Sequence, residues 1–273
     1  MFKKRSLYTL MTVLFLASVV LSACAAPTAT QAPQAPAAPN ATSAPAQSLS
    51  VGIVLPTKDE PRWIQDETRF KEALTKAGYQ VEILFSQGDS AKEKANVEAL
   101  IAKGVKVLVI CPQDATAAAA AADEARAAGV KVISYDRLIR DTDAVDYYVT
   151  FDSIAVGAQQ AQYLVDNAKG TGNPLYLYAG AASDNNAFIF FQGAWSVLQP
   201  KIADGTFVVK NSDEAVALKD KAELTRDEQA RIIGQVTTNW DFNTAKTLAE
   251  SNLTTPEGEP SFIPPENATK LFP

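Results

Sequence analysis

The sequence predicts an α/β fold built on doubly wound parallel sheets, and two features of the chain from residue 49 onward carry this prediction. First, short apolar runs rich in β-branched residues alternate with longer amphipathic stretches. Because these runs are continuous, they suit parallel strands that are covered on both faces. Second, successive amphipathic stretches end at Gly78, Gly104 and Gly129, and glycine tolerates the left-handed backbone that closes a helix. Repeated strand–helix units of this kind imply right-handed crossovers and a doubly wound sheet.

A first series of units runs to residue 151. In chain order we expect strands at 49–55, 81–86, 107–111, 130–135 and 147–151, with helices at 62–77, 91–103 and 116–128 between them. Asp152 is expected to cap the next helix, 154–168, which ends before Gly170.

A second, shorter series follows. Here we expect strands at 175–178 and 207–210 and helices at 187–202 and 225–233. A last helix is expected to end at residue 251. Thr225 and Glu228 have the spacing of a capping box, and Asp241 or Asn243 is expected to cap the last helix. Residues 254–273 show no hydrophobic period and indicate a loop or tail.

The N-terminus predicts export. Three basic residues at 3–5 precede an apolar run, 7–21, which is shorter than the roughly 20 residues that span a bilayer. Cys24 directly follows the sequence Leu-Ser-Ala, so the segment resembles a bacterial lipoprotein signal. This resemblance implies cleavage before Cys24, a diacylglycerol on its thiol and an extracytoplasmic location on the bacterial cell membrane. An ordinary signal peptide or a transmembrane anchor is the alternative.

Composition shifts divide the chain into five segments. They are a signal peptide (1–23), an Ala-, Pro- and Thr-rich disordered tether (24–48), an N-terminal α/β lobe (49–151), a partial C-terminal α/β lobe (152–253) and an irregular tail (254–273). The tether composition cannot bury enough apolar surface to fold, and its prolines favour an extended chain.

Charge and residue content exclude several functions. The net charge is −6, and removal of the three basic residues of the signal leaves −9, since no acidic residue lies in 1–23. A chain this acidic lacks the basic footprint of a nucleic-acid-binding protein. It contains no histidine, and Cys111 ends an apolar run as a small buried residue. We therefore expect no metal site, no cofactor and no histidine-dependent catalysis.

Polar and aromatic residues follow three predicted strands at the ends where parallel strands present their ligands. They lie in the segments 56–63, 135–137 and 183–187. Together these segments supply arginine forks, carboxylates, amides and an aromatic ring, which suit the hydroxyls and the apolar faces of a neutral sugar.

Each of these residues also has a plain structural interpretation. Asp136 and Arg137 could form a solvated surface pair, and Trp63 could be a core residue one turn into its helix. Asn185 and Asn186 could serve only as turn residues.

In combination, however, the motifs resemble those of a known family. They are Gly52-Ile53-Val54-Leu55-Pro56, Arg62-Trp63, Tyr135-Asp136-Arg137, Phe151-Asp152 and Asp184-Asn185-Asn186-Ala187. Their order and spacing are similar to those of the D-xylose-binding and multiple-sugar-binding periplasmic receptors, the type I substrate-binding proteins of ABC transporters. The resemblance runs from about residue 50 to residue 251.

The resemblance implies two lobes that close on a sugar by a hinge motion, with the first crossing near residues 151–153. It places Arg62, Trp63, Asp136 and Arg137 in the first lobe, Trp63 as a stacking face. It places Asp184, Asn185, Asn186 and Trp240 in the second.

The chain departs from the family after residue 251. The family adds further second-lobe strands and closing segments, and 254–273 does not match them. We therefore expect a C-terminally truncated chain with an incomplete second lobe and weakened sugar affinity.

The leading hypothesis is a monomeric, lipid-anchored receptor that delivers a xylose-like aldopentose or a hexose to an ABC permease. A sugar-sensing co-receptor for a membrane sensor in chemotaxis or signalling is the second. A non-functional fragment, or an enzyme that uses two carboxylates on a glycosidic bond, belongs to a different class, and we expect no enzymatic activity. A sugar-responsive repressor is excluded by the export signal.

Overall fold

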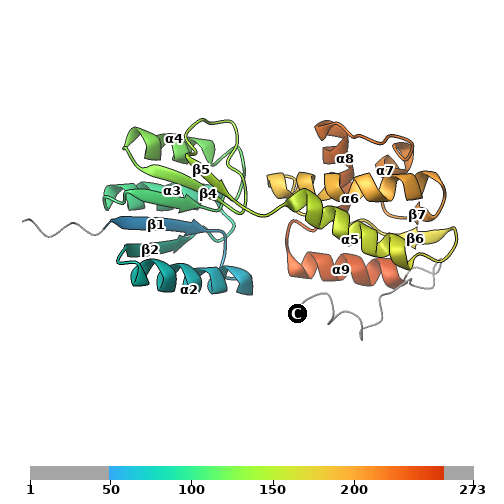
Figure 1. Cartoon of the computed structure of the whole chain (residues 1–273), viewed down its shortest axis with the longest axis horizontal. Helices are drawn as coiled ribbons and strands as arrows, with labels where there is room; N and C mark the ends of the chain where they lie inside the picture. The colour runs from blue at the N-terminus through green and yellow to red at the C-terminus, as the bar shows by residue number, and fades with distance from the viewer. Residues whose placement is uncertain (1–48, 255–273) are drawn as a thin grey trace, which may run out of the picture. The chain divides into compact units, whose positions relative to one another are not determined.

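The computed structural model describes residues 49–254, all within one compact unit, Gln47–Pro273 (Figure 1). The predicted signal peptide, the lipid site at Cys24, the tether and the tail from residue 255 lie outside the described residues. Among the helices of 49–254, none is long and apolar enough to cross a membrane. The lobe boundary at residue 151 remains a prediction, since both regions belong to the same unit.

Residues 49–151 form a parallel five-stranded sheet with the strand order β2-β1-β3-β4-β5. The strands are β1 (Ser50–Leu55), β2 (Gln80–Phe85), β3 (Val107–Ile110), β4 (Lys131–Tyr135) and β5 (Tyr147–Val149). Because the order reverses at β1, β2 lies on one side of it and β3 to β5 on the other. The predicted doubly wound sheet is thus confirmed.

Helices cover both faces of this sheet. They are α2 (Pro61–Lys76), α3 (Ser90–Ala102) and α4 (Ala119–Ala127). One apolar cluster joins Val54 and Leu108 of the sheet to α3 and α4, and a second joins Ile53 and Leu55 to Trp63 of α2. Adjacent residues of β1 point to opposite faces, so a continuous apolar run is needed to fill both clusters.

The predicted helix ends are close to those observed. Gly78, Gly104 and Gly129 have φ of 86°, 80° and 73° just past α2, α3 and α4. Helix α4 begins later than the predicted residue 116, because the Asp114 carboxylate accepts the N–H groups of Thr116 and Ala117 and holds them in a turn.

Residues 152–254 contain more helix than strand. Their elements are α5 (Ser153–Asn167), β6 (Asn173–Leu175), α6 (Asn185–Ala203), β7 (Phe207–Val209), α7 (Asp213–Ala217), α8 (Arg226–Val236) and α9 (Phe242–Thr254). Strands β6 and β7 form a parallel pair, and an isolated bridge joins Ala179 to Thr237. The capping box at Thr225 and Glu228 is confirmed, and Asp241 accepts the Thr244 N–H before α9.

The strand predicted at 175–178 is displaced towards the N-terminus. The structure has β6 at Asn173–Leu175 instead. Beyond it, the Leu177 N–H donates to the Asn211 side chain, and the Leu177 carbonyl accepts from the same amide. A side chain therefore replaces the strand partner of Leu177, which the apolar pattern alone could not indicate. Helix α7 was not predicted.

Helices α5 and α6 approach each other through two glycines. A methyl group on Gly157 would lie 2.0 Å from the Phe190 carbonyl oxygen, and one on Gly193 would lie 2.0 Å from that of Ile154. The two backbones are therefore in direct contact, which only glycine permits at these positions.

A cavity of about 420 Å³ lies between the segment 175–180 and helices α5 and α6.

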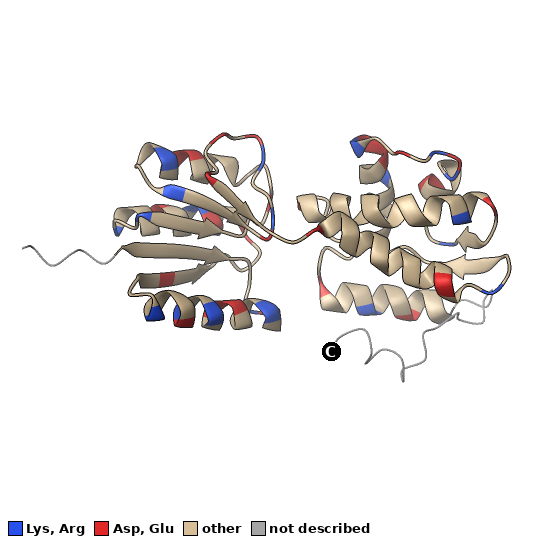
Figure 2. Ribbon diagram, in the orientation of Figure 1, with Lys and Arg blue, Asp and Glu red and all other residues tan. Residues whose placement is uncertain are grey.

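Charges of both signs alternate along α2, as blue and red in Figure 2 show.

Replacing Gly157 by alanine should destabilise the protein by about 1–3 kcal/mol, because the new methyl group meets the backbone of α6. Urea unfolding followed by tryptophan fluorescence measures this change. Gly234→Ala in α8 is the matched control: nothing lies within 4 Å of its added methyl, so it should stabilise by about 0.5–1 kcal/mol. Equal effects of the two substitutions would contradict the glycine contact.

Candidate functional site

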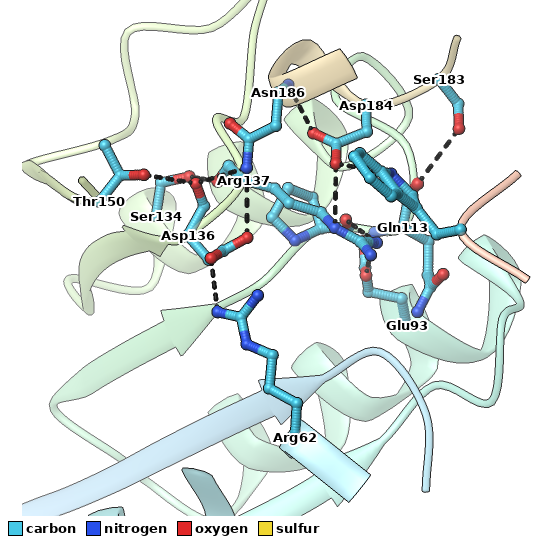
Figure 3. Close-up of polar contacts among 12 residues, drawn as sticks. Arg62, Glu93, Gln113, Ser134, Asp136, Arg137, Thr150, Ser183, Asp184 and Asn186 are labelled. Atoms are coloured by element: carbon cyan, nitrogen blue, oxygen red, sulfur yellow. Dashed lines mark hydrogen bonds and ion pairs between the residues drawn. The ribbon is translucent and has the colours of Figure 1, made fainter. Parts of the chain in front are cut away.

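Asp136, directly after β4, is the centre of a polar cluster (Figure 3). It is 5% exposed, and its φ of 60° is one that aspartate tolerates better than most residues. Its carboxylate accepts from Arg62 Nη2 at 2.5 Å and from Asn186 Nδ2 at 3.2 Å. Its carbonyl oxygen accepts from the hydroxyls of Tyr148 and Thr150. The cluster thus joins α2, the end of β4 and the start of α6.

A buried ion pair lies beside this centre. Arg137 Nε and Asp184 Oδ2 are 3.2 Å apart, and their side chains are 9% and 2% exposed. Arg137 also donates to the Pro112 carbonyl at 3.3 Å. Asp184 accepts the Asn186 N–H at the start of α6 and Trp240 Nε1 at 3.0 Å. Burial raises the pKa of the Asp184 carboxyl, and the positive charge of Arg137 opposes that rise.

Trp63 lies beneath the two guanidinium groups. It is 1% exposed, and its ring centroid is 4.2 Å from Arg62 Cζ and 5.5 Å from Arg137 Cζ. It packs in the apolar cluster of the sheet face and lines neither of the two cavities described here. Trp63 is therefore a core residue that also contacts the two arginines of the site.

Trp240 lies on the wall of both cavities. Its φ of 60° follows a φ of 52° at Asn239, so two left-handed residues turn the ring inward. The ring lies against Gly180, where an added methyl group would be 2.0 Å from Cζ2. Gly180 is thus needed for the ring to occupy this position, which the Asp184 hydrogen bond fixes.

A cavity of about 480 Å³, termed the polar cavity, opens beside these residues. Of the eight predicted site residues, Arg137 and Trp240 line it. Its remaining lining residues are Pro56, Thr57, Asp59, Glu60, Gln87, Gly88, Ser90, Gln113, Asp114, Ala181, Ser183, Asn239, Asp241 and Phe242.

Within residues 49–254, three buried polar atoms near the cluster have no hydrogen-bond partner. They are Gln113 Nε2, Asn186 Oδ1 and Trp63 Nε1. Buried polar groups are normally hydrogen-bonded, and of these three residues Gln113 is the one that lines a described cavity.

Asn185 is the one predicted residue that the structure keeps apart from the cluster. Its Oδ1 accepts from Arg226 Nη1 at 3.1 Å, and that guanidinium lies 3.7 Å from the Phe188 ring centroid. Adjacent residues in the first turn of a helix point in different directions, so Asn186 reaches Asp136 and Asn185 does not.

Two residues of the site were missed by sequence reasoning. Gln113 follows β3 as Asp136 follows β4, and this strand-end position was the available signal. Glu93 gave no signal, because it lies inside α3 among charged residues. It is 2% exposed and accepts the Gln113 N–H at 2.8 Å. Burial raises the pKa of its carboxyl to about 7, against the lowering influence of Arg137.

A family model described as a periplasmic binding protein domain matches residues 51–263. The chain belongs to this family. The predicted resemblance to sugar-binding periplasmic receptors is confirmed. Among the described residues no group of His, Cys, Asp or Glu is placed to hold a metal ion.

Two curated relatives are named for sugars. The chain is 42% identical over 172 residues to a multiple sugar-binding periplasmic receptor of Rhizobium radiobacter, covering 61% of this chain and 48% of that protein. It is 34% identical over 164 residues to the D-xylose-binding periplasmic protein of Escherichia coli, covering 60% and 49%. The periplasmic binding protein described here therefore spans about half the length of these relatives.

Two solved structures share the fold. A carbohydrate transporter solute-binding protein of Chloroflexus aurantiacus, in complex with D-glucose, is 86% identical with a TM-score of 0.73, covering 76% of this chain and 61% of that one. A solute-binding protein of Clostridium phytofermentans with bound β-D-glucose is 32% identical with a TM-score of 0.65, covering 77% and 62%. The predicted fold class is confirmed, and the roles of the eight site residues stay predictions.

Replacing Glu93 by glutamine should remove a pH-dependent loss of stability. The unfolded carboxyl ionises near 4.3, whereas the folded one keeps its proton to about 7. The folded state therefore binds more protons between these values, and stability falls as pH rises through them, by up to about 4 kcal/mol above pH 7.

We expect the stability gain of Glu93→Gln over the native protein to be much smaller at pH 5 than at pH 8. Glutamine keeps an oxygen to accept the Gln113 N–H. Urea unfolding at both pH values measures the difference, and a gap of the same size at pH 5 and pH 8 would contradict the cause given for it.

Proposed function

We propose that this periplasmic binding protein captures a neutral monosaccharide, an aldohexose such as D-glucose or an aldopentose such as xylose. The observation that carries the proposal is the 86% identity to a solute-binding protein in complex with D-glucose. The polar cavity supports it, because a volume of about 480 Å³ lies within the range of small-molecule sites.

The chemistry of the cluster suits hydroxyl recognition. Arg62, Asp136, Arg137 and Asn186 offer several donors and acceptors within one linked network. Sugar hydroxyls donate and accept, so they can share partners with these groups, and the unpaired atoms of Gln113 and Asn186 add capacity. The ring of Trp240 offers a face to the apolar C–H groups of the sugar.

Contacts between residues 49–151 and residues 152–254 support capture by closure. Besides the Arg137–Asp184 pair, the Ala115 N–H donates to the Ser183 carbonyl at 2.9 Å. We propose that opening separates these contacts by a hinge at residues 151–153 and that the sugar enters the opened space.

The predicted location, lipid anchor, oligomeric state and partner belong to the same proposal. It comprises an extracytoplasmic location, a lipid on Cys24, a monomeric receptor and delivery to an ABC permease. A membrane sensor is the second candidate partner. No catalytic role is proposed, because the two central carboxylates, on Asp136 and Asp184, are each engaged by an arginine.

Arg137→Ala should weaken D-glucose binding by about 1.5–3 kcal/mol, which is roughly 10- to 150-fold in Kd. The loss follows because a charge-assisted donor is removed and Asp184 is left without its cation. Isothermal titration calorimetry on the full chain measures it. Arg231→Ala removes an arginine whose partner is the surface residue Glu214, so its Kd should not change. Unaltered affinity in Arg137→Ala would place Arg137 outside the sugar site.

Tryptophan substitutions should separate the two rings. Trp240→Phe should abolish a glucose-induced fluorescence change, because Trp240 lines the polar cavity. Trp63→Phe should retain the change and reduce stability instead, because Trp63 is enclosed by the core and by two guanidiniums. Fluorescence titration and urea unfolding of both variants provide the test; a signal that survives in Trp240→Phe and vanishes in Trp63→Phe would reverse the assignment.

A further inference from the structure

The wall of the polar cavity carries more negative than positive side chains. Its acidic residues are Asp59, Glu60, Asp114 and Asp241, and its one basic residue among the described lining is Arg137. We propose, on the basis of the sugar binding proposed above, that this site admits neutral and protonated amino sugars and rejects anionic ones such as uronates and sugar phosphates.

The positive charge of the wall is already balanced. Arg137 lies 3.2 Å from the buried carboxylate of Asp184, and nearly all of its side chain is enclosed. Arg62, the next arginine, is bound to Asp136 at 2.5 Å. Lys58 lies near the cavity loop, but its ammonium is 4.7 Å from the centre of the Phe85 ring. An anionic ligand would thus have to compete with an existing carboxylate for either arginine.

The negative charges of the wall, in contrast, have no ion-pair partner in the described part of the chain. None of the four acidic residues forms a salt bridge with a lysine or arginine of residues 49–254. Asp114 accepts two backbone N–H groups, and the Thr244 N–H lowers the pKa of Asp241. Both carboxylates are therefore fixed in place by the backbone.

The helix ends reduce this negative charge without cancelling it. Glu60 directly precedes α2 and Asp241 directly precedes α9, and a helix N-terminus is equivalent to about half a positive charge. Ser90, the first residue of α3, also lines the cavity, and the four carboxylates still exceed the half-charges of these three helix ends, so the wall has a net negative charge. Repulsion of this kind is how a site rejects a ligand of matching shape and wrong charge.

The test compares sugars of similar size that carry different charges. D-glucuronate and the neutral D-glucuronamide have nearly the same shape, and D-glucosamine carries a proton on its amine at pH 6.5. Calorimetric titration of the full chain with these three and with D-glucose should give at least about tenfold weaker binding for glucuronate than for glucuronamide. Glucosamine should bind at least as tightly as glucose. The glucuronate deficit should shrink in 0.5 M NaCl, because salt screens the exposed part of the wall.

A triple variant assigns the effect to the wall. Asp59→Asn, Asp114→Asn and Asp241→Asn together should bring the two ligands within about threefold, and asparagine keeps the oxygen that accepts the backbone N–H groups at 114 and 241. The matched control is Asp166→Asn, Asp213→Asn and Asp227→Asn, which removes equal charge from helices α5, α7 and α8 and should leave the deficit unchanged.

Glucuronate and glucuronamide of equal affinity in the native protein would overturn this inference and leave the proposed function standing. A deficit that persists in the wall variant would also overturn it, since the discrimination would then not come from the charges of this wall. If neither D-glucose nor glucuronamide binds, the proposed function fails and this inference fails with it.

Discussion

The Arg137–Asp184 ion pair is the contact on which the candidate site depends. Asp184 begins α6 and receives Trp240, while Arg137 reaches the loop after β3 and lies over Trp63. Two buried charges in such a pair add little net stability, but removal of one leaves the other uncompensated at a cost of several kcal/mol. The pair therefore links the start of α6, the segment of Trp240, the loop after β3 and helix α2. The arrangement of these four segments determines the shape of the polar cavity beside the pair.

Around this pair, the positive charge is buried and the negative charges of the cavity wall are more exposed. The guanidinium of Arg137 is enclosed with its counter-ion, whereas the carboxylates of Asp59 and Asp241 lie on the more exposed wall of the polar cavity. The two tryptophans are sorted in the same way: Trp63 supports the buried cations from below, and Trp240 faces the open volume. The inner part of the site thus holds paired charges, and the outer wall holds exposed carboxylates.

The sequence allowed the sheet and the centre of the site to be predicted, because both follow from periodic rules. Continuous apolar runs and glycine stops locate β1 to β4 and their helices, and parallel strand ends bring Asp136 and Arg137 to one edge. The remainder depends on single side chains. Asn211 ends β6 early, and helix phase directs Asn186 inward and Asn185 towards Arg226. Glu93 meets the Gln113 amide from twenty residues away, which no local pattern reveals.

The contact of Gly157 with Gly193 has a mechanical consequence. Two helices that touch backbone to backbone have no side-chain layer between them to deform, so we expect α5 and α6 to move together as one rigid body. Helix α5 starts at Ser153, and helix α6 starts at Asn185, next to the Asp184 carboxylate that contacts Arg137. A small rotation of the backbone at residue 152 would therefore displace Asp184 directly, and the contact between Asp184 and Arg137 would break or form in a single step.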